Sequence, residues 1–99
     1  MLATAQMSAG VCPQRSEHVQ ARKVGRDTLL VHLLLKQYHV LNHIAGRIWD
    51  LADGKRSDGD IAAEIAEEFN VDRTIVDDDV ASTLQTLTDL RLIELKVPS

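Results

Sequence analysis

The spacing of apolar residues changes its period within one short segment, residues 38–54. Tyr38 and Val40 alternate with polar neighbours, which is typical of a strand. After Asn42 the apolar positions fall three and four apart, as they do on one side of a helix. This stripe consists of Ile44, Ala45, Ile48, Trp49, Leu51 and Ala52. The sequence therefore predicts a strand that runs into a helix through a single joint residue, Asn42.

The residues at the two ends of this predicted helix suit their positions. An Asn side chain at the N-cap accepts a hydrogen bond from the first helical turn and stabilises by ~1 kcal/mol. Gly54 follows the last apolar position, where a left-handed backbone costs a glycine least. The joint at Asn42 therefore fixes the angle between the strand and the helix.

Length and composition limit the class of protein. The 99 residues provide one modest core, and only three of them are aromatic, so this core is mostly aliphatic. Cys12 is the single cysteine, which excludes an internal disulfide and suits a reducing cytoplasm. The longest apolar run, Leu33–Leu35, is too short to span a bilayer, and no signal peptide is visible. We expect a cytoplasmic protein that makes no membrane contact.

The first part of the chain predicts a small sheet. Residues 1–16 lack apolar periodicity, so we expect a flexible N-terminal segment followed by one domain over residues 17–97. Weak alternation over 17–24, and the Leu- and Val-rich segment 28–34, indicate two strands before the strand at 38–41. Short connections between the three strands predict an antiparallel meander.

Three helices are expected after the meander. The first covers residues 43–52, and the second begins after Ser57, which has Asp60 three residues later in the manner of a capping box. The third covers about 72–90 and is followed by a short apolar tail. Strands segregated from helices give an α+β class, with the outline of a winged helix-turn-helix. We assign to the core Leu41, Ile48, Trp49, Ile65, Leu84 and Leu87.

No combination of residues indicates catalysis. Cys12 lies in the segment expected to be flexible, where nothing would hold it against a base. His39 and His43 are four apart but lie on opposite sides of the strand–helix joint, and no Cys completes a metal site. The carboxylates of Asp77–Asp79 point about 100° apart on a helix and cannot converge on one ion. We expect no enzyme activity, no metal and no cofactor.

Nucleic-acid binding is the alternative function, because a winged helix has the same outline. The reading helix would be the third, Asp72–Arg91, which carries five acidic and two basic side chains. Duplex affinity depends mainly on cations that neutralise phosphates, so this helix would be repelled. An interaction subunit without a peptide guest is a third possibility.

The edge of the meander is the other candidate surface. An edge strand has unpaired N–H and C=O groups that can pair with a peptide strand. If residues 38–41 form this edge, the third helix can form the opposite wall of a peptide site. The candidate site residues are Gln37, Tyr38, His39, Val40 and Leu41 on the strand, and Val76, Asp79, Val80 and Thr83 on the helix. A plain core role is an equal alternative for Tyr38, Val76 and Val80.

The chain resembles the PqqD family, named for pyrroloquinoline quinone biosynthesis. The pattern that carries the resemblance begins Tyr38-x-Val40-Leu41-Asn42-x-x-Ala45-x-x-Ile48-Trp49-x-Leu51-x-Asp53-Gly54 and continues with Ile61-Ala62, Ile65, Asp79-Val80, Leu84-x-x-Leu87 and Leu92-Ile93. It covers about residues 19–95. The chain departs from the family at Trp49, where many members carry a smaller aliphatic residue.

The resemblance implies a recognition element for ribosomally synthesised, post-translationally modified peptides. Such a protein is non-catalytic and binds the leader of a precursor peptide as an extra strand between its third strand and third helix. A chain of this length is most similar to the free-standing leader-binding protein of a lasso-peptide pathway. The implied partners are the precursor leader peptide, a transglutaminase-like cysteine leader peptidase and an ATP-dependent cyclase.

Overall fold

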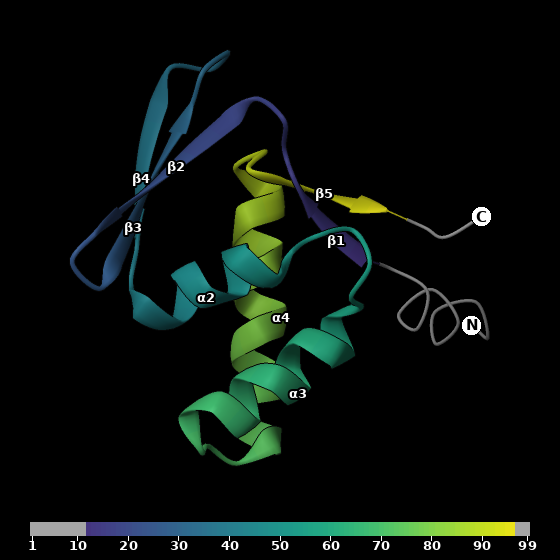
Figure 1. The fold of residues 1–99 in the computed structure, drawn as a ribbon. Coiled ribbons are helices and arrows are strands. Elements are labelled where there is room, and N and C mark those ends of the chain that lie inside the picture. The colour runs from purple at the N-terminus through teal and green to yellow at the C-terminus, as the bar shows by residue number, and fades with distance from the viewer. Residues whose placement is uncertain (1–11, 97–99) are drawn as a thin grey trace.

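The computed structural model describes residues 12–96, which form two small antiparallel sheets and three helices (Figure 1). The elements in chain order are β1 (Cys12–Arg15), β2 (Val19–Val24), β3 (Asp27–His32), β4 (Gln37–Leu41), α2 (His43–Leu51), α3 (Asp58–Phe69), α4 (Arg73–Asp89) and β5 (Ile93–Lys96). The predicted α+β class, a three-stranded meander followed by three helices, is confirmed. No helix within the described range is long and apolar enough to cross a membrane.

The meander β2–β3–β4 has β3 at its centre, so β2 and β4 are both edge strands. The β2–β3 connection has only two residues, and Gly25 adopts a left-handed backbone (φ 63°) there, which a tight hairpin turn requires. On β4, Tyr38 lies opposite Val31 and Val40 lies opposite Leu29. This register decides which side chains share a face of the sheet.

A second sheet joins the two ends of the described chain. Strand β1 pairs antiparallel with β5, with Cys12 opposite Lys96. Pro13 is buried, and its carbonyl accepts the N–H of Gly54 at 2.8 Å. The prediction of a flexible segment over residues 1–16 is therefore wrong for Cys12–Arg15, whose backbone groups are bonded to β5 and to the loop after α2. The ordered part of the chain thus includes Cys12–Arg15, and residues 1–11 and 97–99 lie outside the described residues.

The helix starts follow the capping residues that the sequence indicates. The side chain of Asn42 accepts the N–H of Ala45 at 2.8 Å, which confirms the strand–helix joint. Ser57 and Asp60 form the expected capping box at the start of α3. At the start of α4, Asp72 accepts the N–H of Thr74 at 2.9 Å. Bonds from the hydroxyl and the N–H of that Thr lower the pKa of the Asp72 carboxyl.

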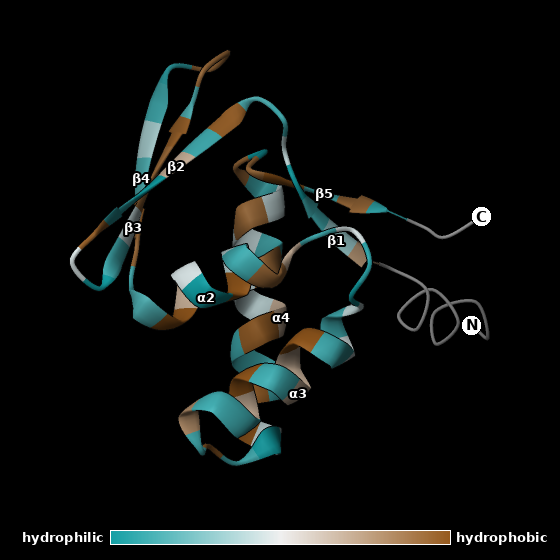
Figure 2. Ribbon diagram, viewed as in Figure 1, coloured by the Kyte–Doolittle hydropathy of each residue, from teal (hydrophilic) through white to brown (hydrophobic). Residues whose placement is uncertain are grey.

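The core lies between one face of the meander and the three helices. Of the six residues assigned to it, five are buried: Ile48, Trp49, Ile65, Leu84 and Leu87. Leu41 is only partly buried, because it lies on the edge strand β4 and packs against the margin of the core. Colouring by hydropathy shows apolar and polar positions alternating along α4, and an apolar connection between β3 and β4 (Figure 2). That apolar connection leads directly into β4.

Candidate functional site

Strand β4 is an exposed edge of the meander. It pairs with β3 on one side only, and its Tyr38 and Val40 side chains are 74% and 67% exposed. Large apolar side chains with such exposure on an unpaired strand edge offer backbone pairing and apolar contact at the same place. The core alternative for Tyr38 is therefore wrong.

The backbone groups of β4 that remain free can be located from the hydrogen-bond pattern. Leu33, which follows β3, donates its N–H to the carbonyl of His18 at the β2 side, at 2.8 Å. The N–H and C=O groups of successive strand residues point to opposite sides of the strand. Since those of Leu33 point to β2, those of His32 point to β4, where His32 lies opposite Gln37. Every second residue of β4 from Gln37 onward is then bonded to β3. The N–H and C=O of Tyr38 and Val40 therefore point toward the free edge.

The side chains of β4 divide between the two faces of the sheet. His39 lies opposite the fully buried Leu30 and so belongs to the inner face, as do Gln37 and Leu41. The Nε2 atom of His39 is buried and has no hydrogen-bond partner within residues 12–96. An unpaired buried polar atom costs about 1–3 kcal/mol. The inner face beside the free edge thus contains one unsatisfied polar group.

The candidate residues on α4 fall into two classes. Val76 and Val80 are only 4% and 2% exposed and belong to the core, which confirms the core alternative for both. Asp79 is exposed and Thr83 is half-buried. Asp79 and Thr83 are therefore accessible at the surface of α4, whereas Val76 and Val80 lie beneath it.

The flank of α4 that carries Asp79 and Thr83 lies away from α3. On the other flank, Asp77 and Ala81 line a cavity of about 230 Å³ together with α3 residues. At about 100° per residue, Asp79 and Thr83 fall on the opposite side of the buried stripe. The meander makes its helix contacts mainly through α2, while α4 packs mainly on α3, α2 and β5. The structure thus gathers the strand candidates on one edge and the two accessible helix candidates on one flank.

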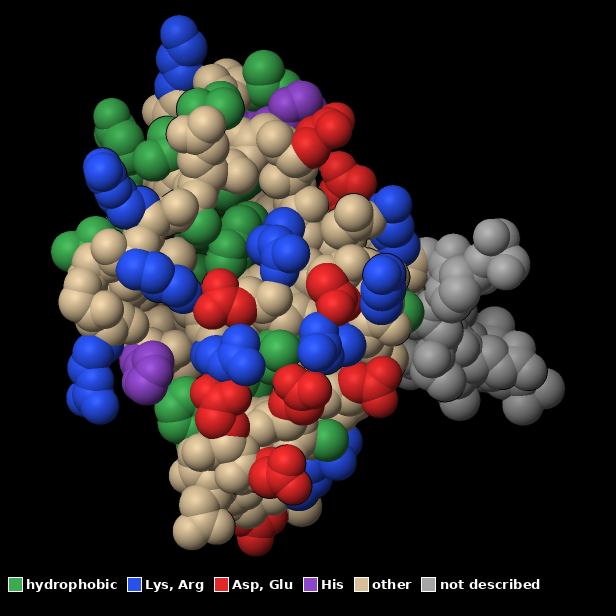
Figure 3. Space-filling view, in the orientation of Figure 1, with side chains coloured by type: hydrophobic (Ala, Val, Ile, Leu, Met, Phe, Trp, Pro, Cys, Tyr) green, Lys and Arg blue, Asp and Glu red, His purple; other side chains and the backbone are tan. Residues whose placement is uncertain are grey.

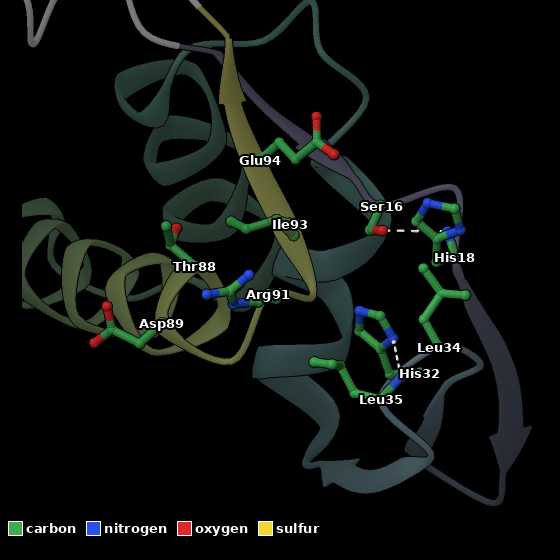
Figure 4. Close-up of a pocket in the computed structure, with 10 residues that line it drawn as sticks. All are labelled: Ser16, His18, His32, Leu34, Leu35, Thr88, Asp89, Arg91, Ile93 and Glu94. Carbon is green, nitrogen blue, oxygen red and sulfur yellow. Dashed lines mark hydrogen bonds between the residues drawn. The ribbon is translucent and has the colours of Figure 1, made fainter.

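The sequence did not indicate a larger cavity, about 590 Å³ in volume, which lies beside the connection between β3 and β4 (Figure 4). His32 is 5% exposed there and accepts the N–H of Leu35 through Nδ1 at 3.2 Å. The ring of His18 stacks on it with centroids 6.4 Å apart. Figure 4 shows that Arg91 and Ser16 face the same space from other segments. Because these residues come from distant parts of the chain, no local motif indicates the cavity.

The loop after α2 is held by charge-assisted hydrogen bonds. Asp53 accepts the N–H groups of Lys55 and Arg56 at 2.9 and 3.0 Å, and the Arg56 guanidinium lies 2.6 Å from its other oxygen. These backbone bonds, with the Arg56 charge, lower the pKa of Asp53. Within residues 12–96, no three His, Cys, Asp or Glu side chains gather as a metal site would require.

Comparison with protein families gives a match over residues 27–93, to the family described as coenzyme PQQ synthesis protein D (PqqD). The chain belongs to the PqqD family. No curated protein matches this PqqD-family chain. The match begins with β3 and ends at the start of β5, so it includes β4 and all three helices.

Solved structures share the fold of this PqqD-family chain. TbiB1 in complex with the TbiA(beta) leader peptide is 28% identical, with a TM-score of 0.74 over 82% of this chain and 94% of that one. A lasso peptide synthetase B1 complexed with the leader peptide is 20% identical, with a TM-score of 0.73 over 83% of this chain and 96% of that one. The PqqD truncation of Methylobacterium extorquens PqqCD, a stand-alone RiPP recognition element, is 21% identical, with a TM-score of 0.69 over 83% and 87%. The last two likenesses concern the fold alone.

Proposed function

We propose that this chain binds the leader segment of a ribosomally synthesised precursor, of the lasso-peptide kind, as an additional strand on β4. It acts without catalysis and delivers the precursor to a transglutaminase-like cysteine leader peptidase and an ATP-dependent cyclase. The observation that carries the proposal is the free edge of β4, where Tyr38 and Val40 direct unpaired backbone groups outward. The 28% identity to a protein that was solved with a leader peptide supports it.

In this proposal the backbone and the side chains of β4 have separate tasks. The N–H and C=O groups of Tyr38 and Val40 pair with any extended guest and set its register. Guest side chains on the inner face meet His39 and the α4 flank that carries Asp79 and Thr83. The exposed Asp79 carboxylate, which makes no salt bridge within residues 12–96, favours a basic or hydrogen-bonding guest side chain there. Affinity thus comes from the edge, and selection comes from the inner face and α4.

A proline on each edge of the meander tests the proposal with a matched control. Val40→Pro removes an N–H that faces the proposed guest, whereas Ala21→Pro removes one at the free edge of β2. Each substitution takes away one donor from an edge and leaves the bonds to β3 in place.

The measurement is a fluorescence-polarisation titration with the labelled leader of a lasso-peptide precursor, to be identified as a short gene next to the gene for this chain, and with a scrambled leader as control. A lost strand hydrogen bond of about 1 kcal/mol, with the clash of the proline ring, weakens binding by about tenfold or more. We expect this for Val40→Pro and an unchanged affinity for Ala21→Pro, with both variants folded by circular dichroism. Equal affinities in the two folded variants would contradict strand addition at β4.

A further inference from the structure

The face of the meander opposite the core is apolar on β3, on the connection after it and on β4. This apolar part consists of Leu29, Val31, Leu33, Tyr38 and Val40, which we call the outer face; on β2 the same side of the sheet carries Gln20 and Arg22, opposite Val31 and Leu29. Leu29 lies opposite Val40, and Val31 lies opposite Tyr38. Leu33 continues this face into the hairpin connection, where it is 48% exposed. The helix α2 packs on the other face, where Gly46 approaches the buried Thr28.

The outer face contains a small hollow next to the connection between β3 and β4. The hollow has a volume of about 210 Å³ and is lined by Val31, His32, Leu33, Lys36 and Tyr38. A hollow of this size accepts one apolar side chain. Protein interfaces often centre on such an anchor, in which one partner's apolar or aromatic side chain fills the other's hollow.

The charges around the outer face differ in sign from those of the helices. Between Val19 and Leu41 the chain has four basic side chains and one acidic one, whereas between His43 and Asp89 it has four basic and twelve acidic. Of the four basic side chains in the meander, Lys23 lies on the inner face opposite Thr28 and pairs with Asp50 at 3.0 Å, which leaves Arg22, Arg26 and Lys36. Figure 3 shows Lys and Arg side chains around the meander, and Asp and Glu side chains interspersed with Lys and Arg over the helices. Arg22, opposite Leu29, and Lys36, beside the hollow, make no salt bridge within residues 12–96. The outer face therefore has an apolar centre and a basic rim.

We propose that the outer face is the docking surface for the enzyme that processes the bound peptide, through a surface of that enzyme with an apolar centre and an acidic rim. This inference rests on the proposed function. Tyr38 and Val40 contribute their backbone to the guest strand and their side chains to the outer face. A guest strand on β4 therefore extends this face, and one enzyme surface contacts both. A second copy of this chain would bring the two basic rims together, and like charges oppose that.

This arrangement couples the two binding events. If the enzyme contacts the guest and the outer face together, the guest raises the affinity of this chain for the enzyme. By linkage the enzyme raises the affinity for the guest by the same factor. The enzyme then binds this chain more tightly when the precursor leader is bound to it than when the chain is free.

The test uses Leu33→Glu, which places a carboxylate in the hollow but lies outside β4. Ile75→Glu is the matched control, because Ile75 is 58% exposed on α4, away from the outer face. A purified leader peptidase, to be identified from the genes next to the gene for this chain, is titrated by biolayer interferometry against immobilised chain loaded with the leader. We expect Leu33→Glu to weaken peptidase binding at least tenfold and Ile75→Glu to change it less than twofold. Both variants should bind the leader alone as the unmodified chain does.

The outcomes separate the two proposals. Peptidase affinity unchanged in Leu33→Glu, with the leader bound, would overturn the docking surface and leave the proposed function in place. Absence of leader binding by the unmodified chain would overturn the proposed function, and the docking surface with it. A dimer of the unmodified chain in sedimentation velocity that disappears in Leu33→Glu would assign the outer face to a second copy and overturn the docking of an enzyme.

Discussion

Gly46 decides how closely α2 approaches β3, and Gly46→Ala measures the tightness of that contact. A Cβ built at Gly46 lies 2.5 Å from the Thr28 hydroxyl and 3.3 Å from its Cβ. Thr28 is only 1% exposed, so its side chain has no open space into which to move. Overpacking of this kind costs about 1–3 kcal/mol, whereas Ala in place of a helical Gly gains about 0.5–1 kcal/mol. The clash is the larger effect, and we expect a net loss of about 1–2 kcal/mol.

Gly59→Ala is the control, because a Cβ at Gly59 meets its nearest atoms at 3.7 and 3.9 Å, which is ordinary contact. There the gain in helix propensity acts without a clash, and stability should be unchanged or rise by up to ~1 kcal/mol. Urea unfolding followed by the fluorescence of the buried Trp49 gives both free energies of unfolding. If Gly46→Ala were as stable as Gly59→Ala, the close packing of α2 on β3 would be refuted.

Three further substitutions test the joint, the loop and the α4 flank. Asn42→Ala removes the N-cap of α2 and should lower the free energy of unfolding by about 1 kcal/mol in the same urea assay. Asp53→Asn should lower the free energy of unfolding at pH 7. Folding lowers the pKa of Asp53, so the stabilisation by its carboxylate is present above the ordinary carboxyl range and disappears as pH falls below the folded pKa. The unfolding curves of the variant and the unmodified chain should therefore converge in acid. Asp79→Arg should weaken leader binding in polarisation titrations without lowering the melting temperature, since Asp79 is exposed; an unchanged affinity would remove that residue from the site.

The local features of the fold could be predicted because each depends on neighbouring residues. The change of apolar period around Asn42 and the capping box at Ser57 are short-range patterns, and both end in hydrogen bonds that the structure contains. The buried positions of the helices likewise follow the helical period, as for Trp49. The edge position of β4 follows from the order of three strands in a meander.

The features that the sequence did not indicate depend on distant segments. The Cys12–Arg15 strand has no alternating pattern of its own and is defined by β5, some eighty residues later. Strand pairing fixed the face that Tyr38 occupies, and packing against α3 fixed the depth of Val80. A charged substitution at Val80 would therefore enter the core and disturb the fold, whereas Asp79 tests the site alone. The direction of the His39 backbone also depends on strand pairing. Its N–H pairs with β3, so the free edge of β4 must be tested at Tyr38 and Val40.

Amide hydrogen exchange by NMR, with and without the leader peptide, tests strand addition at β4 most directly. We expect the amides of Tyr38 and Val40 to gain protection when the leader binds, because their N–H groups become paired. The amides of Ala21 and Lys23, at the free edge of β2, should exchange at the same rate in both samples. Protection gained on β2 but not on β4, or no gain on either edge in the presence of bound leader, would contradict the account.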